Sequence, residues 1–259
     1  MGVALCGALV NRPDAGQERG ADSENRGNAT RRPADSATRE PVPAHYALDR
    51  WLAVHHLDIP FCRYADDGIL HCRNKAEANL LRKQLDQRLR DCGLEMHPEK
   101  TRVVYCKDSK RMGTHEHITF DFLGYTFRPR RIVDGRGRVR TGFTPAASRQ
   151  AMKAMRQSMR RWHLPLRSEL SLDDLARIMA RRVRGWIAYY CRFRGSEFQS
   201  VADHLDSIII RWAMRKYKRL RGRKTRAFAW LVRVKRRQPS LFVHWCGRGG
   251  FSVEAMGAR

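Results

Sequence analysis

Residues 59–72 read Ile-Pro-Phe-Cys-Arg-Tyr-Ala-Asp-Asp-Gly-Ile-Leu-His-Cys, so two adjacent carboxylates, Asp66 and Asp67, lie between apolar runs. Asp67-Gly68 is a tight-turn signal, and the stretch therefore predicts a β-hairpin with both carboxylates at its tip. Such a pair can hold Mg²⁺, which prefers oxygen ligands and shares them with substrate phosphates. The alternative is a surface hairpin in which the aspartates only favour the turn.

The charge of the chain is strongly basic and unevenly distributed. The sequence has a net charge of +26. Residues 145–259 hold 27 basic and 7 acidic residues, a net charge of +20, whereas residues 1–44 are neutral overall. This density favours a nucleic acid as partner, because neutralising phosphates releases counterions. An anionic membrane surface is the weaker alternative, because the sequence has no long apolar span and no lipidation signal.

The cysteines indicate a reducing compartment. The seven are spread along the chain and form no CxxC pair. We therefore expect reduced thiols in a cytoplasmic protein, without a thiolate metal site. No membrane partner is expected, because the sequence has no long apolar span and no lipidation signal. Residues 1–10 are apolar but lack a basic start, which is not typical of a signal peptide.

Residues 1–44 differ in composition from the rest. Residues 11–43 are rich in Gly, Ala, Asn, Arg, Asp and Pro and have almost no large apolar side chain. Such a segment cannot bury enough apolar surface to offset the entropy lost on ordering. We expect residues 1–44 to be disordered and the folded part to begin near His45.

Residues 45–144 predict an α+β unit with an antiparallel sheet. Asn74 and Glu77 form a capping pair for a helix that stops at Gly93, and Gly124 marks a bend. The expected elements are a helix over 45–55, the hairpin over 60–72, a helix over 74–93, a strand over 103–106, and a hairpin or bent strand over 119–127.

From Pro145 onward the periodicity is helical. Thr144 before Pro145 favours a helix start. Four apolar stripes with spacings of three and four residues predict a helical bundle whose core they form. The stripes run over residues 147–162, 172–190, 201–212 and 228–234.

Several stretches of this sequence resemble the group II intron reverse transcriptases, also called intron-encoded maturases. The hairpin Phe-Cys-Arg-Tyr-Ala-Asp-Asp at 61–67 is one, and Phe-Asp-Phe-Leu-Gly-Tyr-Thr-Phe at 120–127 is another. The stretches follow the family's order and cover residues 45–246. The others are residues 45–51, 92–101, 184–190 and 212–218.

This resemblance implies a partial right-hand polymerase palm at residues 45–144. An all-α thumb with maturase-specific helices (domain X) would follow at residues 145–246, and a tail at 247–259. It implies a nucleotidyltransferase of the RNA-directed DNA polymerase type, which uses Mg²⁺, an RNA template and a DNA primer. It also implies binding of group II intron RNA to assist splicing and mobility.

The family's site residues carry over to matching positions of this sequence. Asp66 and Asp67 would be the catalytic carboxylates and metal ligands. The resemblance places Tyr64 and Ala65 beside the primer end or incoming nucleotide, Lys100 near the nucleotide's phosphates, and Phe122, Leu123 and Gly124 against the primer strand. A solvated surface lysine is the alternative for Lys100.

A dense basic run in the C-terminal part predicts RNA contact. Eight of the twelve residues from 215 to 226 are basic and none is acidic, which is too unbalanced for an ordinary solvated helix face. Tyr217 interrupts the run and can stack on a base. The predicted RNA-binding residues are Arg215, Lys216, Tyr217, Lys218, Arg219, Arg221, Arg223, Lys224, Arg226, Lys235, Arg236 and Arg237.

The sequence departs from the family before His45. The family has a further metal-binding carboxylate on an earlier strand, and fingers, in the region that should precede His45. Asp14, Asp22 and Asp35 lie in no strand-like apolar run. We therefore expect a truncated protein, an incomplete polymerase site that is inactive alone, and an unpaired sheet edge where earlier strands belong.

Three hypotheses follow from this departure. A complementing chain with fingers and the rest of the palm would complete the site. Alternatively, the chain is an RNA-binding splicing module without catalytic activity. The third hypothesis is a non-functional remnant.

Overall fold

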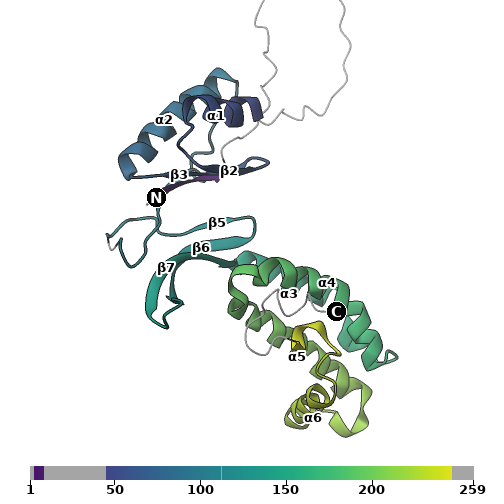
Figure 1. The fold of residues 1–259 in the computed structure, drawn as a ribbon. Helices are drawn as coiled ribbons and strands as arrows, with labels where there is room; N and C mark the ends of the chain where they lie inside the picture. The colour runs from purple at the N-terminus through teal and green to yellow at the C-terminus, as the bar shows by residue number, and fades with distance from the viewer. Residues whose placement is uncertain (1–2, 9–44, 112, 247–259) are drawn as a thin grey trace, which may run out of the picture. The chain divides into compact units, whose positions relative to one another are not determined.

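The computed structural model describes residues 3–8, 45–111 and 113–246. The chain divides into two compact units, Met1–Ile118 and Thr119–Arg259. Each unit contains an antiparallel sheet, and helices pack against both sheets (Figure 1). The α+β class expected from the sequence is therefore confirmed, whereas the division between the units falls earlier than the expected boundary at 144/145.

The sheet of the first unit has four antiparallel strands in the order β2-β3-β1-β4. The hairpin of β2 (Phe61–Tyr64) and β3 (Asp67–Cys72) forms one side. The strand β1 (Val3–Ala8) lies between β3 and β4 (Arg102–Tyr105) and pairs antiparallel with both. Leu5 is opposite Leu70 on one side and Val103 on the other.

Strand β1 corrects two expectations. Residues 1–44 were expected to be disordered, but Val3–Ala8 form a central strand, and a short continuous apolar run of this kind is typical of a strand in the interior of a fold. The expected unpaired edge is also wrong at this position, because β1 pairs with the facing edges of β3 and β4. The remainder of the segment expected to be disordered, residues 1–2 and 9–44, lies outside the described residues.

Helices cover the first sheet and bury its apolar side chains. The π-helix η1 (His45–Arg50), the α-helix α1 (Trp51–His55) and the long α2 (Lys75–Asp91) supply Leu48, Leu52, Leu81 and Leu85, which pack with Leu70 of β3. Each such buried side chain stabilises the fold by about 1.5–3 kcal/mol. The single helix predicted over 45–55 thus has two segments.

The predicted cap of α2 is present. The Asn74 side chain accepts a hydrogen bond from the Glu77 backbone N–H at 2.8 Å, and the helix ends before Gly93, whose φ is 73°. The Glu77 carboxylate in turn accepts from the Arg73 N–H.

The sheet of the second unit has the order β5-β6-β7. Its strands are β5 (Phe120–Phe122), β6 (Tyr125–Val133) and β7 (Val139–Ala147). The expected helix start at Thr144-Pro145 is wrong, because Pro145 pairs with Phe127 inside β7. The helix α3 (Arg149–Arg160) begins after Ser148, whose hydroxyl accepts from the Ala151 N–H.

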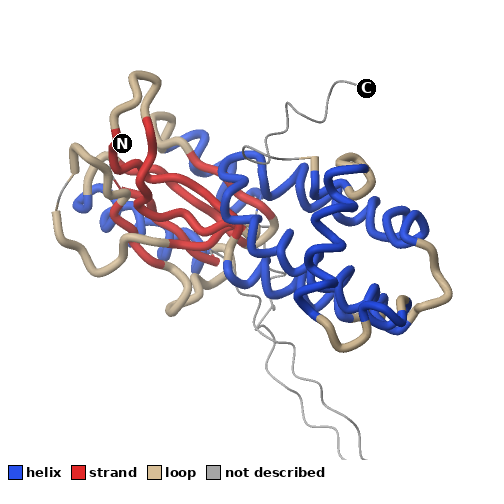
Figure 2. The backbone as a smooth tube through the Cα atoms, turned by 90° about the horizontal axis from the view of Figure 1, so that it is seen from below, coloured by secondary structure: helices blue, strands red, loops and turns tan. Residues whose placement is uncertain are grey.

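Helices form most of the described chain from α3 onward (Figure 2). They bury most of the predicted stripes in a core that includes Phe198, Leu205 and Trp212, but Ala147 of the first stripe lies in β7. The fourth stripe is only partly correct: Leu231 is buried, but Phe228 is 58% exposed and Ala227 takes the inner position. The remaining elements are η2 (Leu164–Leu166), α4 (Leu172–Arg194), η3 (Gly195–Phe198), α5 (Gln199–Lys216), η4 (Lys218–Leu220), α6 (Lys224–Arg237) and η5 (Val243–Trp245).

Among the described residues, no helix combines the length and the apolar character needed to cross a bilayer.

Candidate active-site hairpin and nucleic-acid interface

The carboxylate hairpin turns through Ala65 and Asp66. Tyr64 pairs with Asp67, so Asp67 already belongs to β3 rather than to the turn predicted at Asp67-Gly68. Ala65 has a φ of 53°, a left-handed conformation that is unfavourable for a residue with a Cβ. The turn thus sets Asp66 at the tip and Asp67 at the start of the strand.

An ion pair between Arg63 and Asp49, which was not predicted from the sequence, anchors this turn. Arg63 donates from Nε and Nη2 to the two carboxylate oxygens of Asp49, each at 2.6 Å, and from Nη1 to the carbonyl oxygen of Ala65 at 2.6 Å. Burial alone would raise the pKa of Asp49, but hydrogen bonds from Arg63 and His45 hold it below its usual value. A bidentate pair of this kind fixes geometry as well as charge. Fourteen residues separate the partners, and no local pattern marks such a pair.

The two carboxylates and the predicted lysine lie near one another. Burial raises the pKa of Asp67, the neighbouring Asp66 raises it further, and the Lys100 ammonium opposes both effects. The structure therefore brings Asp66, Asp67 and Lys100 within electrostatic range. Tyr64 is 65% exposed beside them.

This pair fits a divalent cation that is shared with a phosphate. The Asp66 carboxylate repels that of Asp67 and raises its pKa, and a bound cation would offset this repulsion. Mg²⁺ commonly binds one or two carboxylates together with substrate oxygens. Among the described residues, no cluster of three or more His, Cys, Asp and Glu side chains is placed to hold a metal. The neighbouring strand β1 reaches Asp67 at Ala8, and its residues Val3–Ala8 include no acidic side chain.

In the second unit, the predicted primer-contact residues form a tight hairpin turn. Phe122 pairs with Tyr125, while Leu123 and Gly124 have φ values of 49° and 77°. The Tyr189 hydroxyl donates to the Leu123 carbonyl oxygen at 2.9 Å. The turn is thus held by α4, and the predicted hairpin over 119–127 is confirmed.

A strongly basic surface lies on η4, α6 and the residues between and beside them. From Ser207 to Val253 the sequence contains no acidic residue. Within the described chain, the predicted RNA-binding cations on this surface form no ion pair with a carboxylate. We call them the η4–α6 basic surface: Arg215, Lys218, Arg219, Arg221, Arg223, Lys224, Arg226, Arg236 and Arg237.

Two family models match this chain at the features just described. The model for the reverse transcriptase (RNA-dependent DNA polymerase) matches residues 42–127, which contain the hairpin and Lys100. The model for the group II intron maturase-specific domain matches residues 152–230, which contain η4 and the first half of α6. The chain belongs to the group II intron reverse transcriptase/maturase family. A comparison with curated proteins finds no match.

In this reverse transcriptase/maturase, two predicted RNA-binding lysines have partners inside the protein. The Lys216 ammonium donates to the carbonyl oxygens of Ser168 and Leu170 at 3.0 and 2.7 Å. Lys235 forms an ion pair with Asp206. Both lysines therefore hold the bundle together, and sequence alone does not separate them from their exposed neighbours.

Asp206 is the centre of a cluster that joins α5 to the C-terminal end of the described chain. Besides Lys235, it accepts hydrogen bonds from Trp245 Nε1 at 2.8 Å and from His244 Nε2 at 3.0 Å. Burial by itself would raise the pKa of Asp206, but these donors lower it. Burial lowers the pKa of His244, and the neighbouring Asp206 carboxylate opposes that shift.

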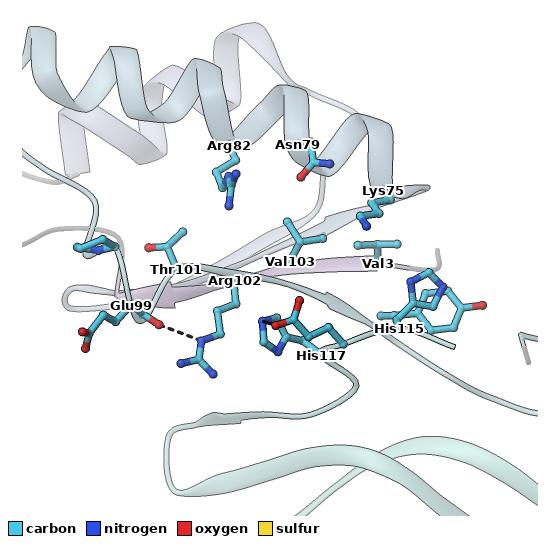
Figure 3. A pocket seen from close by; sticks show the side chains of 13 residues that line it. Val3, Lys75, Asn79, Arg82, Glu99, Thr101, Arg102, Val103, His115 and His117 are labelled. Atoms are coloured by element: carbon cyan, nitrogen blue, oxygen red, sulfur yellow. Dashed lines mark hydrogen bonds and ion pairs between the residues drawn. The ribbon is translucent and has the colours of Figure 1, made fainter. Parts of the chain in front are cut away.

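The first unit of this family member also contains a polar pocket of about 340 Å³ (Figure 3). Lys75, Asn79 and Arg82 extend from α2 toward β4, whereas the Arg102 side chain points away from that helix, and its Nε donates to the Glu99 carbonyl oxygen at 2.9 Å. His115 and His117 also line it, together with two glutamates. This mixture of charges does not single out one class of ligand.

Proposed function

We propose that this chain binds group II intron RNA through the η4–α6 basic surface and assists the folding of that RNA for splicing and mobility. The observation that carries the proposal is the set of nine cations without carboxylate partners among the described residues, in a stretch that contains no acidic residue. The match to the maturase-specific domain over residues 152–230 supports the same assignment.

Phosphate binding follows from the chemistry of this surface. Seven of the nine cations are arginines, whose planar guanidinium groups suit bidentate contacts with phosphate oxygens. Cations that already pair with carboxylates would have to give up those partners, whereas these have none to lose within the described chain. Binding driven by such contacts weakens steeply as the salt concentration rises, because the release of counterions into a more concentrated salt solution contributes less free energy to binding.

We further propose that the hairpin descends from a polymerase palm and retains part of its metal site. The strand order β2-β3-β1-β4 and the reverse transcriptase match support a palm, with the helices of the second unit as thumb and domain X. Asp66 and Asp67 would hold Mg²⁺ together with nucleotide phosphates, with Lys100 close by. When bound there, Mg²⁺ would stabilise charge on the phosphates of an incoming nucleotide.

The same hairpin argues against DNA synthesis by this chain alone. The strand that faces Asp67 supplies Ala8 at that register, and a two-metal site needs further carboxylates. In our proposal, the RNA template, the DNA primer and their contacts at Tyr64, Ala65, Phe122, Leu123 and Gly124 matter only when another chain completes the site. In this sheet, β1 already occupies the position beside β3. A complementing chain would therefore have to place its fingers and palm residues around a sheet that already contains β1.

Equilibrium binding tests the RNA proposal. Full-length protein is titrated with a structured group II intron RNA and with an unstructured RNA of equal length. The surface variant Lys218→Gln/Arg219→Gln/Arg221→Gln should bind the intron RNA much more weakly than wild type. The control Arg73→Gln/Arg90→Gln changes exposed arginines of the first unit that already pair with Asp58 and Asp86, and should bind like wild type. Equal loss in both variants, or no preference for the intron RNA, would overturn the proposal.

A further inference from the structure

A pocket of about 750 Å³ opens on the second unit between η4 and α6. Its volume lies within the range of about 300–1,000 Å³ that small-molecule sites occupy. The residues around it combine two aromatic rings with cations and contain no acidic side chain. The residues that matter here are Tyr217, Lys218, Arg219, Arg226, Trp230 and Arg233.

The two aromatic rings are held in place at the pocket. The ring centroids of Tyr217 and Trp230 are 5.7 Å apart, with the planes tilted by 53°. The buried Trp212 supports Tyr217 from behind in an edge-to-face contact at 5.8 Å. Tyr217 is still 37% exposed, so an aromatic surface remains available to a ligand.

Cations surround these rings on the pocket side. Lys218 and Arg219 come from η4, and Arg226 and Arg233 come from α6. Within the part of the chain that the structure describes, none of the four pairs with a carboxylate. Lys216 also lines the pocket, but its ammonium is engaged by Ser168 and Leu170 and lies 5.4 Å from the Trp212 ring centroid.

We propose that this pocket takes one unpaired nucleotide of the bound RNA, its base against Tyr217 and Trp230 and its phosphates on Lys218, Arg219, Arg226 and Arg233. The proposal rests on the RNA-binding function proposed above and specifies the part of the RNA that is recognised. Aromatic faces stack on bases that lie outside a helix, whereas bases inside an A-form duplex are covered by their neighbours. The cations alone would suit any polyanion, and the aromatic rings select a nucleotide among polyanions.

A pair of hairpin RNAs tests this inference on the full chain. One hairpin carries a single bulged 2-aminopurine, and the other has the same stem without the bulge. Wild type should bind the bulged hairpin more tightly and should quench the 2-aminopurine emission, because the base stacks on the rings. Tyr217→Ala and Trp230→Ala should each weaken binding of the bulged hairpin by about 5- to 150-fold, the range for loss of one stacked base. Their affinity for the paired hairpin should stay near that of wild type.

Three controls separate stacking from folding and from charge. Phe228→Ala removes an exposed ring of α6, the helix that also contains Trp230. The Phe228 ring does not line the pocket, so the affinities for both hairpins should stay unchanged. Tyr217→Phe keeps the stacking face and the packing against Trp212, and should retain the bulge preference. Lys218→Gln/Arg219→Gln should weaken binding of both hairpins, because phosphates are common to both.

The results distinguish failure of this inference from failure of the RNA-binding proposal. Wild type that binds both hairpins equally and leaves 2-aminopurine emission unchanged would overturn the nucleotide pocket while RNA binding stands. Wild type that binds neither hairpin would overturn both. Polyglutamate that competes as well as the bulged hairpin would show an acidic protein partner instead and would also overturn the pocket. If an alanine variant fails to fold, the wild-type quenching and the Tyr217→Phe result still decide.

Discussion

At the scale of single residues, the hairpin depends on interactions that cross the sequence. Arg63 fixes the conformation of the turn that bears Asp66 and Asp67, because it donates hydrogen bonds to both the Asp49 carboxylate and the Ala65 carbonyl oxygen. The sequence predicts Asp66 and Asp67 from their adjacency, since a local pattern marks them. It does not predict Asp49 or Arg63 as a pair, nor the engagement of Lys216 and Lys235, because contacts between distant residues leave no local pattern.

The titration of Asp67 should report its neighbours. Because Asp66 raises the pKa of Asp67 and Lys100 opposes it, Asp66→Asn should lower that pKa and Lys100→Gln should raise it. Carbon-13 NMR of the labelled carboxyl groups, followed over pH, measures both shifts. Saturating Mg²⁺ should lower the pKa of Asp67 in wild type, because the cation favours the charged form. The same pKa of Asp67 in both variants and in wild type would contradict the arrangement of these three groups.

Gly124 should resist substitution for two reasons. Its φ of 77° disfavours a side chain, and an added Cβ would lie 3.0 Å from the Tyr190 hydroxyl oxygen. We expect Gly124→Ala to lower the free energy of unfolding by about 1–3 kcal/mol in thermal or denaturant melts.

Two glycines of the β6–β7 turn provide matched controls for that substitution. Gly137 shares a positive φ of 75° but has open space around it, and Gly135 has open space without a positive φ. Gly137→Ala should therefore destabilise less than Gly124→Ala, and Gly135→Ala should be nearly neutral. Equal free energies of unfolding for all three variants would contradict the conformation described for the turn at Gly124.

The Asp206 cluster should make the free energy of unfolding depend on pH in the acidic range. The lowered pKa of Asp206 means that its contribution is present above the unfolded value of 3.8 and is lost as pH falls through the folded value. Asp206→Asn should lower the free energy of unfolding by about 1–3 kcal/mol at neutral pH, because it weakens a partly buried ion pair and its hydrogen bonds. The difference from wild type should shrink below pH 3.8 in denaturant melts. Asp203→Asn, on the exposed side of α5, should change little, and a pH-independent difference for Asp206→Asn would contradict the lowered pKa.

At the scale of elements, local signals predict what local interactions determine. The cap of α2 and the apolar stripes of α4 and α5 are recognisable because each lies within one helix. Strand β1 is missed because its partners, β3 and β4, lie far along the sequence and a polar segment follows it. Pro145 misleads for a related reason: it suits a helix start, but pairing with β6 keeps it in a strand.

Breaking β1 should expose the facing edges of β3 and β4. Leu5→Pro replaces a residue in the centre of this strand, where proline removes a backbone donor and distorts the pairing. Each ladder hydrogen bond lost in the interior should cost about 1–3 kcal/mol. Hydrogen exchange should then show faster exchange of β3 and β4 amides, while the amides of α5 in the second unit stay protected. Unchanged protection of β3 and β4 would contradict the pairing of β1.

At the scale of the whole molecule, the paired carboxylates and the densest positive charge belong to different compact units. The carboxylate hairpin belongs to the first compact unit and the η4–α6 basic surface to the second. The family could be inferred from the sequence because its motifs occur in order, and the two matching models agree with that inference. Which basic residues have partners inside the protein could not be inferred, because that depends on where Asp206 and the carbonyl oxygens of residues 168 and 170 lie in the fold.

The most direct test of the central claim is the salt dependence of intron RNA binding by the full chain. We expect Asp66→Asn/Asp67→Asn to bind with the affinity and salt slope of wild type. Lys218→Gln/Arg219→Gln/Arg221→Gln should bind more weakly, with a logarithmic slope shallower by about 2–3, since each phosphate contact contributes about 0.7–0.9. If the hairpin variant loses binding, or if the surface variant keeps the wild-type slope, RNA recognition does not reside on the η4–α6 basic surface.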